Sequence, residues 1–341
     1  MTGDIGFAVV GAGRIGALHA RHLAGSVDGA RLVMVVDADE ATALRVAGGR
    51  PGVSIGTDIA EALDARDVHA VLIASPTSLH SQQLLAAAAA GKAIFCEKPV
   101  ANDLQETIRA MVAVTAAGVP FQIGFNRRFD PAYAAVGTAV RTGKIGAVEL
   151  FRSQSSDPGP APEAYIASSA GFFKDSVIHD IDTARFVAGE VERVTALGRV
   201  MVDPVYERYG DVDTSVISIE FVSGALGVLM NSRRTVYGHD LRLEVHGSLG
   251  KVVAEDERAT KVWNYDAGGV HGDFYYHFIE RFTAAYRLEL QAFVTAVKAG
   301  EPPTPGATDA IESLRVAEAA EMSLKHGRSV ALSELRTEVT A

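Results

Sequence analysis

The sequence predicts an α/β protein in which a doubly wound parallel sheet is followed by an α+β domain with a large, mostly antiparallel open sheet covered by helices. Two observations support this. The first third alternates short apolar runs rich in β-formers with helical segments. After Ile123 this alternation stops, and longer β-rich runs separated by turns follow. We therefore divide the chain into residues 1–123 and residues 124–341.

The elements of the first domain follow from apolar runs and helix caps. The strands are expected at residues 5–10, 31–36, 53–55, 70–74, 93–96 and 119–123, and the helices directly after the first strand and at residues 59–63, 78–90 and 104–117. Apolar strands that alternate with helices are typical of a parallel sheet covered on both faces.

A glycine-rich turn joins the first strand to the first helix. It reads Gly11-Ala12-Gly13-Arg14-Ile15-Gly16, a G-x-G-x-x-G motif in a strand–turn–helix setting. We expect Gly11 to permit the tight turn, Gly13 to let a pyrophosphate approach the backbone, and Gly16 to let the helix pack closely on the strand. The motif predicts a dinucleotide-binding Rossmann domain.

An acidic residue at the end of the second strand indicates which dinucleotide binds. Asp37 stands about twenty residues past the last glycine, where a carboxylate accepts hydrogen bonds from the ribose hydroxyls and repels a 2′-phosphate. We therefore predict NAD rather than NADP, although Arg14 offers a phosphate contact that weakens this preference. The other expected cofactor contacts are Ile15, Ser75, Glu97 and Lys98.

The fifth strand ends in Glu97-Lys98-Pro99. Ligands of open α/β sheets bind at the carboxyl ends of the strands, so Lys98 is expected to reach the reacting end of the cofactor and polarise a substrate oxygen. Pro99 restricts Lys98 to an extended backbone and permits a cis peptide bond. A solvated loop lysine is the alternative interpretation.

Longer β-rich runs, with turns at Ser223-Gly224 and Ser248-Leu249-Gly250, predict the sheet of the second domain. The strands are expected at residues 147–154, 192–200, 213–221, 225–232, 241–246, 251–254 and 261–265, and the helices at residues 131–141, 173–185, 274–299 and 308–326.

The helix at residues 173–185 carries the residues of most chemical interest. Asp175 and His179 stand four positions apart, so a regular helix places both on one face. A carboxylate beside an imidazole can transfer protons, with a histidine of ordinary pKa near 6.5 as the base. The alternative is an ordinary pair on a helix surface. We expect Asp182, at another angle of the helix, to be structural.

Composition excludes several classes of protein. The formal net charge of −10 argues against nucleic acid as a partner, and the basic pairs Arg127-Arg128 and Arg233-Arg234 are isolated. The longest alanine-rich run, Leu84 to Ala90, is too short to span a membrane, and the N-terminus lacks a basic signal region. A single cysteine, Cys96, permits no intrachain disulfide and fits a reducing cytoplasm.

We expect no metal site. His271, Asp273 and His277 lie close together in the sequence, but their spacing fits no common zinc pattern.

Four motifs together resemble one family. They are the glycine motif, Glu97-Lys98-Pro99, the segment Gly124 to Asp130, and Asp175-x-x-x-His179. The chain resembles the glucose–fructose oxidoreductase/inositol dehydrogenase/MocA family, and within it the inositol 2-dehydrogenases, over essentially its whole length.

The resemblance implies an enzyme that transfers a hydride from a ring carbinol to C4 of NAD. His179 is expected to act as base, Asp175 to orient it, and Lys98 to donate to the reacting oxygen. The expected substrate is a small polyhydroxylated ring, with myo-inositol oxidised to 2-keto-inositol as first choice. The alternatives are a pyranose, an anhydrosugar or another inositol isomer, and, in a different class, a non-catalytic protein that senses NAD.

The resemblance also implies contacts beyond the catalytic set. Asp157 and Tyr237 are expected to bind substrate, and Asn126 and Arg127 to lie near the cofactor. The family often carries Ser-Arg-Asp-Pro where this chain has Ser156 in place of the arginine. Family members commonly pair through the open face of the second-domain sheet, so we expect a homo-oligomer, a dimer or tetramer, in which a half-apolar face is covered.

Overall fold

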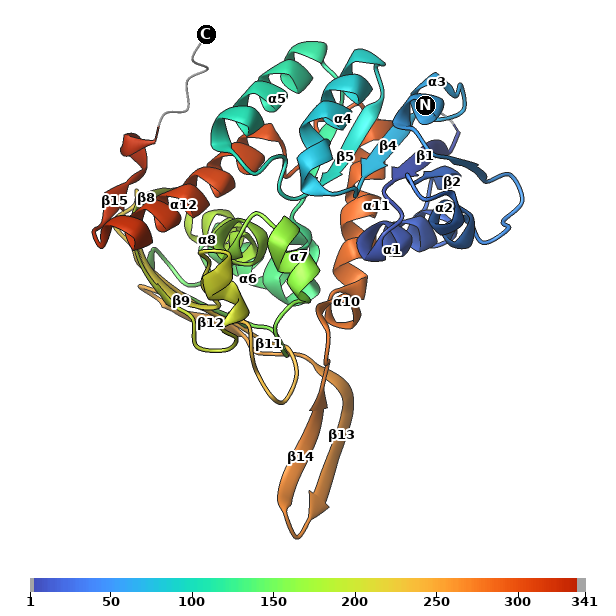
Figure 1. Ribbon diagram of the computed structural model, residues 1–341. Coiled ribbons are helices and arrows are strands. Elements are labelled where there is room, and N and C mark those ends of the chain that lie inside the picture. The colour runs from blue at the N-terminus through green and yellow to red at the C-terminus, as the bar shows by residue number, and fades with distance from the viewer. Residues whose placement is uncertain (1–2, 336–341) are drawn as a thin grey trace. The chain divides into compact units, whose positions relative to one another are not determined.

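The computed structural model describes residues 3–335, and these form two compact units (Figure 1). The first unit contains the described residues up to Asn126 together with Tyr286–Glu312, and the second contains Arg127–Ala285 and the described residues from Ser313 onward. The boundary at Asn126 lies close to the expected division after Ile123. The segment Tyr286–Glu312, however, belongs to the first unit, whereas the sequence division assigns it to the second.

The first unit is built on a six-stranded parallel sheet in the order β3-β2-β1-β4-β5-β6. This order, with its reversal beside β1, is the doubly wound topology that the sequence predicts. The strands are β1 Ile5–Val10, β2 Ala30–Val36, β3 Ser54–Gly56, β4 Ala70–Ile73, β5 Ala93–Glu97 and β6 Phe121–Gly124.

Helices cover this sheet, and a helix from late in the chain joins its core. Leu290 and Phe293 of that helix are fully buried among side chains of β1, β2 and β5, and the Phe293 ring lies 5.9 Å from those of Phe7 and Phe95. Burial of these large side chains explains why this segment belongs to the first unit. The helices are α1 Arg14–Leu23, α2 Glu40–Ala47, α3 Ile59–Asp64, α4 Thr77–Ala89, α5 Leu104–Ala117 and α11 Thr283–Ala299.

The second unit is built on a seven-stranded sheet in the order β12-β11-β7-β10-β9-β8-β15. Its strands pair antiparallel except for β7 and β10, which run parallel. The strands are β7 Val148–Ser156, β8 Val191–Arg199, β9 Thr214–Phe221, β10 Leu226–Ser232, β11 Asp240–Gly247, β12 Gly250–Ala254 and β15 Val330–Ala331.

One face of this sheet is covered and the other is open. Helices α6 Pro131–Arg141 and α8 Ile178–Ala188 pack together and contact β12 and β7. The strand register places one set of exposed apolar side chains on the opposite face. They are Leu150, Leu197, Val216, Leu226 and Val253.

The helix expected from Phe173 is not uniform. Phe173–Val177 forms a π-helical turn, and the α-helix α8 begins at Ile178. Asp175 lies in the π turn and His179 in the first turn of α8. The segment is therefore not the regular α-helix that the sequence predicts. Single π turns of this kind are frequent at functional sites.

A second correction concerns the helix expected from Phe274. Strands β13 Arg258–Asp266 and β14 Gly269–Phe274 form a separate hairpin, and Phe274 ends the second strand. The helical region begins only with α10 Phe278–Arg281, whose first turn is capped by the side chain of His277. Strand pairing to β13 thus extends through Phe274 and takes precedence over helix formation. The hairpin projects from the rest of the second unit (Figure 1).

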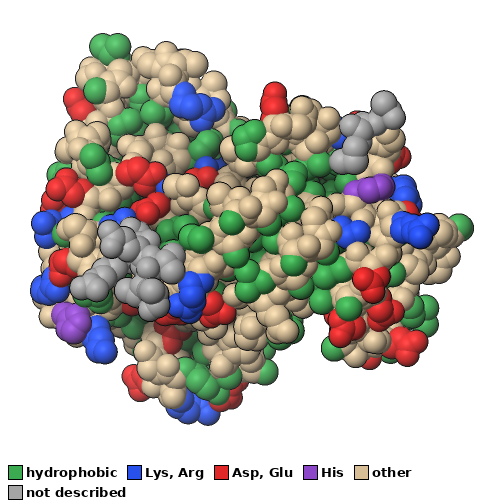
Figure 2. Space-filling view, turned by 90° about the horizontal axis from the view of Figure 1, so that it is seen from above, with side chains coloured by type: hydrophobic (Ala, Val, Ile, Leu, Met, Phe, Trp, Pro, Cys, Tyr) green, Lys and Arg blue, Asp and Glu red, His purple; other side chains and the backbone are tan. Residues whose placement is uncertain are grey.

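The remaining helices of the second unit are short or lie near the end of the chain. They are α7 Glu163–Ser168, α9 Val205–Arg208 and the part of α12 Ala307–His326 from Ser313 onward, and 3-10 turns occur at Asn126–Phe129 and Leu332–Glu334. Within residues 3–335, no helix combines the length and apolarity that a membrane crossing requires. Acidic and basic side chains are interspersed on the face shown in Figure 2. This differs from the basic stripe of nucleic-acid-binding proteins.

Candidate functional site

The glycine-rich loop is shaped by two close approaches and one open position. Gly11 has φ +90°, and a Cβ there would lie 2.4 Å from the backbone nitrogen of Ser75. A Cβ on Gly16 would lie 1.8 Å from the carbonyl oxygen of Gly11, so α1 packs directly on the loop. A Cβ on Gly13 would meet nothing within 4 Å. The loop is therefore tightly packed at Gly11 and Gly16 and open at Gly13.

The N-terminus of α1 meets the end of β2 at this loop. Asp37 accepts hydrogen bonds from the backbone N–H of Ala12 at 2.7 Å and from that of Asp39 at 3.0 Å. No side chain caps α1, and Arg14 and Ile15 lie in its first turn. Uncapped N–H groups at a helix start favour an anion. These features are those of a dinucleotide site.

A buried histidine connects the loops that follow β4 and β5. His80 Nε2 lies 2.8 Å from the carbonyl oxygen of Ser75, and its Nδ1 lies 2.8 Å from that of Pro99. Burial lowers the pKa of His80. The peptide bond between Lys98 and Pro99 is cis. Sequence reasoning missed His80, because it lies in a helix without a motif of its own.

The carboxyl group of Glu97 faces the interior of the first unit. His19 Nε2 lies 2.7 Å from Glu97 Oε1, and a Cβ on Gly124 would lie 3.1 Å from Glu97 Oε2. Glu97 was expected to contact the cofactor, and the structure shows its side chain 13% exposed beside His19.

Arg127 and Arg128, which follow the buried Asn126, pair with two aspartates of α8. Arg127 Nη1 lies 2.9 Å from Asp180 Oδ1, and Arg128 pairs with both oxygens of Asp182 at 2.6 and 2.9 Å. Both arginines have little exposure, unlike the solvated pairs that are most common. Asp182 therefore has the structural role expected from the sequence.

Asp180 also attaches α8 to the sheet. Its fully buried carboxylate accepts hydrogen bonds from Ser153 and Ser155 on β7 and from Asn231 on β10. Because a buried carboxylate is stable only with such donors, these contacts fix the helix that carries His179.

Asp175 is held by two residues that the sequence analysis did not assign to a site. The Tyr165 hydroxyl donates to Oδ1 at 2.9 Å, and Arg233 Nη2 lies 3.3 Å from Oδ2. Arg233 Nη1 donates to Asp157 Oδ2 at 2.9 Å, and its guanidinium lies 5.0 Å from the centre of the Phe172 ring. A single arginine therefore bridges Asp175 and Asp157.

Asp157 is a counter-ion in this arrangement. Burial favours its protonated form, but the neighbouring His239 and the charge of Arg233 prevail and lower the pKa of Asp157 to about 2. His239 Nε2 lies 3.5 Å from Asp157 Oδ1. Arg233, which directly follows β10, places a guanidinium beside Asp157.

The other residues singled out from the sequence lie elsewhere. Tyr237 is 56% exposed, and its hydroxyl donates to Asp240 Oδ2 at 2.7 Å. His271 Nε2 lies 3.5 Å from Asp266. Lys98 belongs to the first unit, whereas Asp175 and the half-buried His179 belong to the second.

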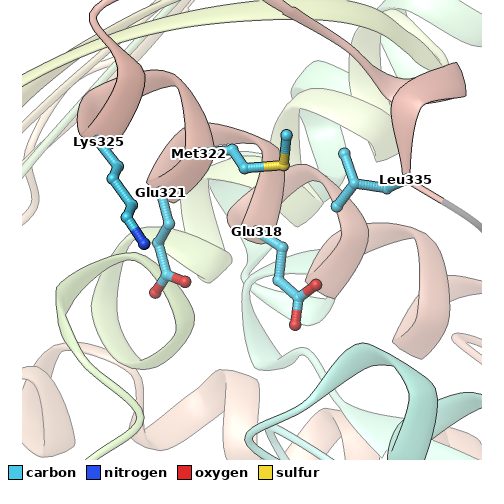
Figure 3. Close-up of a pocket in the computed structure, with 5 residues that line it drawn as sticks. All are labelled: Glu318, Glu321, Met322, Lys325 and Leu335. Atoms are coloured by element: carbon cyan, nitrogen blue, oxygen red, sulfur yellow. The ribbon is translucent and has the colours of Figure 1, made fainter.

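A hollow in the second unit is separate from these residues. It has a volume of about 210 Å³. Figure 3 shows the residues that line it, namely Glu318, Glu321, Met322, Lys325 and Leu335. Lys174 Nζ lies 3.0 Å from Glu321 and 3.6 Å from Glu318. None of the expected site residues lines it.

Comparisons with known proteins agree with both units. Residues 5–125 match the model of the oxidoreductase family NAD-binding Rossmann fold, and residues 138–332 match that family's C-terminal alpha/beta domain. The myo-inositol 2-dehydrogenase of Thermotoga maritima is 43% identical over 96% of this chain and 98% of its own length. The inositol 2-dehydrogenase of Rhizobium meliloti is 40% identical over 96% and 99%.

A solved structure of a related protein has the same fold. The scyllo-inositol dehydrogenase of Lactobacillus casei, with bound NAD(H) and scyllo-inositol, superposes with a TM-score of 0.89 at 29% identity. The match covers 97% of this chain and 99% of that one.

Proposed function

Because the chain belongs to the Gfo/Idh/MocA oxidoreductase family and is an NAD-dependent oxidoreductase, we propose that it oxidises a ring hydroxyl of a cyclic polyol. We propose myo-inositol as the substrate and 2-keto-inositol as the product. The names of relatives that match nearly the whole chain support this choice. The observation that carries the catalytic proposal is Asp175, held by Arg233 and Tyr165 on the turn before His179.

Three side chains are proposed to handle the proton and the substrate oxygen. His179 accepts the proton of the reacting hydroxyl, since an imidazole is suited to this task near neutral pH. Asp175 orients the imidazole and stabilises its protonated form. Lys98 donates to the reacting oxygen and favours the developing alkoxide.

The cofactor assignment uses residues of the first unit. NAD accepts the hydride when it is bound. The open backbone at Gly13 and the uncapped start of α1 are proposed to hold its pyrophosphate. Asp37 is proposed to accept hydrogen bonds from the adenosine ribose, which favours NAD over NADP. Ser75, Glu97 and Asn126 are proposed to shape the rest of this site.

The test of this function is NADH absorbance after the purified protein is mixed with NAD and a panel of polyols and sugars. We expect turnover with myo-inositol above that with pyranoses and anhydrosugars. Faster turnover with another inositol isomer, a pyranose or an anhydrosugar would reassign the substrate within the same chemistry. NAD binding without turnover of any compound would favour the sensor function and contradict the proposed reaction.

We further propose that the protein is a homo-oligomer, a dimer or tetramer, that pairs through the open face of the seven-stranded sheet. Three apolar side chains on this face are between 43% and 65% exposed, namely Leu197, Val216 and Leu226. Burial of such a surface against a second copy of the chain is favourable. Light scattering coupled to size-exclusion chromatography gives the mass, and Leu226→Glu is expected to lower it. A cytoplasmic location is also proposed, since the single buried thiol of Cys96 fits a reducing compartment.

A further inference from the structure

Glu289 is a fully buried acid on the helix that joins the core of the first unit. Its side chain is 0% exposed, and neither of its carboxyl oxygens accepts a hydrogen bond from a described residue. It lies one turn before Phe293, which packs against β1 and β5. A buried carboxylate without donors is strongly unfavourable, so this group must hold either a proton or a cation.

Two ionisable groups face Glu289 from neighbouring elements. They are His19 of α1 and Glu97 of β5, and each offers an atom within 4.8 Å of a Glu289 oxygen. Gln122 of β6 donates to the backbone carbonyl of Glu289 at 3.2 Å, so that contact does not serve the carboxyl group. On the same helix, the ring of Tyr286 lies 5.6 Å from that of His19.

The geometry favours a proton over a metal ion. His19 Nε2 and Glu97 Oε1 are 2.7 Å apart, which is a hydrogen-bond distance. Two ligands of one zinc or magnesium ion, with bonds of about 2.0–2.1 Å, stand roughly 2.9 Å or more apart. A nitrogen that donates its proton to Glu97 is also unable to bind a metal through the same lone pair.

We propose that Glu289 is a protonated carboxylic acid in the folded protein and donates a hydrogen bond to Glu97, so that Glu289 and His19 together position Glu97. Burial, reinforced by the negative charge of Glu97, raises the pKa of Glu289 well above its ordinary value. This proposal about the charge of Glu289 is independent of which reaction the protein catalyses.

The consequence for catalysis rests on the proposed function. Glu97 directly precedes Lys98, and Gly124 leaves little room beside its carboxyl group, where a Cβ would approach to 3.1 Å. A Glu97 side chain held by donors from α1 and α11 therefore fixes the end of β5. Glu289 is a positioning residue for Lys98.

Infrared spectroscopy of the full-length protein at neutral pH tests the charge state. We expect the wild-type protein to show the carbonyl band of a buried, protonated carboxylic acid, and Glu289→Gln to lack it. Glu301→Gln, which changes an exposed acid just beyond α11, is the matched control and should keep the band. An unchanged band in Glu289→Gln would overturn the proposal, as would a stoichiometric divalent metal that the wild type holds and this variant loses.

Kinetics test the positioning role. Gln retains an N–H donor toward Glu97, so Glu289→Gln should keep kcat within about threefold, whereas Glu289→Leu should lower kcat about tenfold with a smaller change in KM. Equal loss of kcat in both variants would show that an amide donor does not replace the carboxylic acid and would overturn the positioning role, as would near-normal kcat in Glu289→Leu. If Glu289→Leu fails to fold, the infrared comparison still decides the charge state. If the wild type oxidises no polyol, the proposed function fails while the infrared result stands.

Discussion

Arg233 and Asp175 form a 3.3 Å contact in which the same guanidinium also binds Asp157 at 2.9 Å. The arginine follows β10 directly, and Asp157 follows β7 directly. These two strands run parallel with Ser232 opposite Ser156, so their ends meet at one edge of the sheet. The sheet therefore determines how the carboxylate of Asp175 is held.

Arg233→Gln is expected to lower kcat by about 10- to 100-fold, because hydrogen bonds between charged groups contribute about 1.5–3 kcal/mol. KM for the polyol should change less, since Arg233 is proposed to act through Asp175. Arg234→Gln is the matched control, because the Arg234 guanidinium contacts the carbonyl oxygens of Met201 and Val202 at 3.4 and 3.5 Å. Equal kcat values in the two variants would contradict the positioning role of Arg233.

Asp157 should contribute to stability in a defined pH range. Its pKa falls from the ordinary 3.8 to about 2 in the folded protein. The ionised Asp157 therefore stabilises the folded protein by about 2 kcal/mol at pH values above its pKa in the unfolded chain. This contribution is lost as the pH falls through its pKa in the folded protein. Asp157→Asn should lower the free energy of unfolding by this amount at pH 7, and the difference should shrink as the pH falls toward 2 and vanish below it. Urea unfolding across this range measures it, and a difference independent of pH would refute the assignment.

His179→Ala is expected to lower kcat by about 10²–10⁴, the usual contribution of a general base. His246→Ala is a suitable control, because His246 is a partly exposed histidine on β11 that contacts Glu244. NADH absorbance with saturating polyol gives kcat, and circular dichroism verifies that both variants fold. Near-normal turnover in His179→Ala would remove this residue from the proposed mechanism.

The parts of the molecule that could be predicted from sequence are those set by local pattern. The glycine loop and the parallel sheet follow from short apolar runs and from glycine spacing, which depend on near neighbours in the chain. The Asp175–His179 segment was recognised, but its π turn at Phe173–Val177 was not, because helical periodicity does not report one inserted residue.

The parts that sequence reasoning missed depend on contacts between distant segments. Arg233 looked like half of an isolated basic pair, since the meeting of its strand end with that of β7 is a property of the sheet register. Glu289 lies within the helix expected at residues 274–299 and belongs to none of the motifs found in the sequence. Its burial arises because α11, which follows β6 by about 160 residues, packs in the core of the first unit.

Asp37→Ser should shift the cofactor preference. Removal of the carboxylate abolishes its repulsion of a 2′-phosphate and weakens a contact to the ribose, so the ratio of kcat/KM for NADP to that for NAD should rise about tenfold or more. Asp39→Ser, an exposed acid two positions on, should leave the ratio unchanged. Initial rates with each cofactor measure the ratio, and the same preference in Asp37→Ser and the wild type would contradict the ribose assignment.

Two glycines of the loop should separate cofactor binding from folding. Gly13 has φ −66° and open space at its Cβ position, so Gly13→Ala should fold with an unchanged melting temperature. The added methyl group occupies the space proposed for the pyrophosphate, so the dissociation constant for NAD should rise about tenfold or more.

In Gly16→Ala the new Cβ would lie 1.8 Å from the Gly11 carbonyl oxygen, and the loop and helix must separate. This variant should therefore melt at a lower temperature even without NAD. Thermal melts and NAD titration calorimetry test the pair, and normal NAD affinity in Gly13→Ala would show that the pyrophosphate does not approach the backbone there.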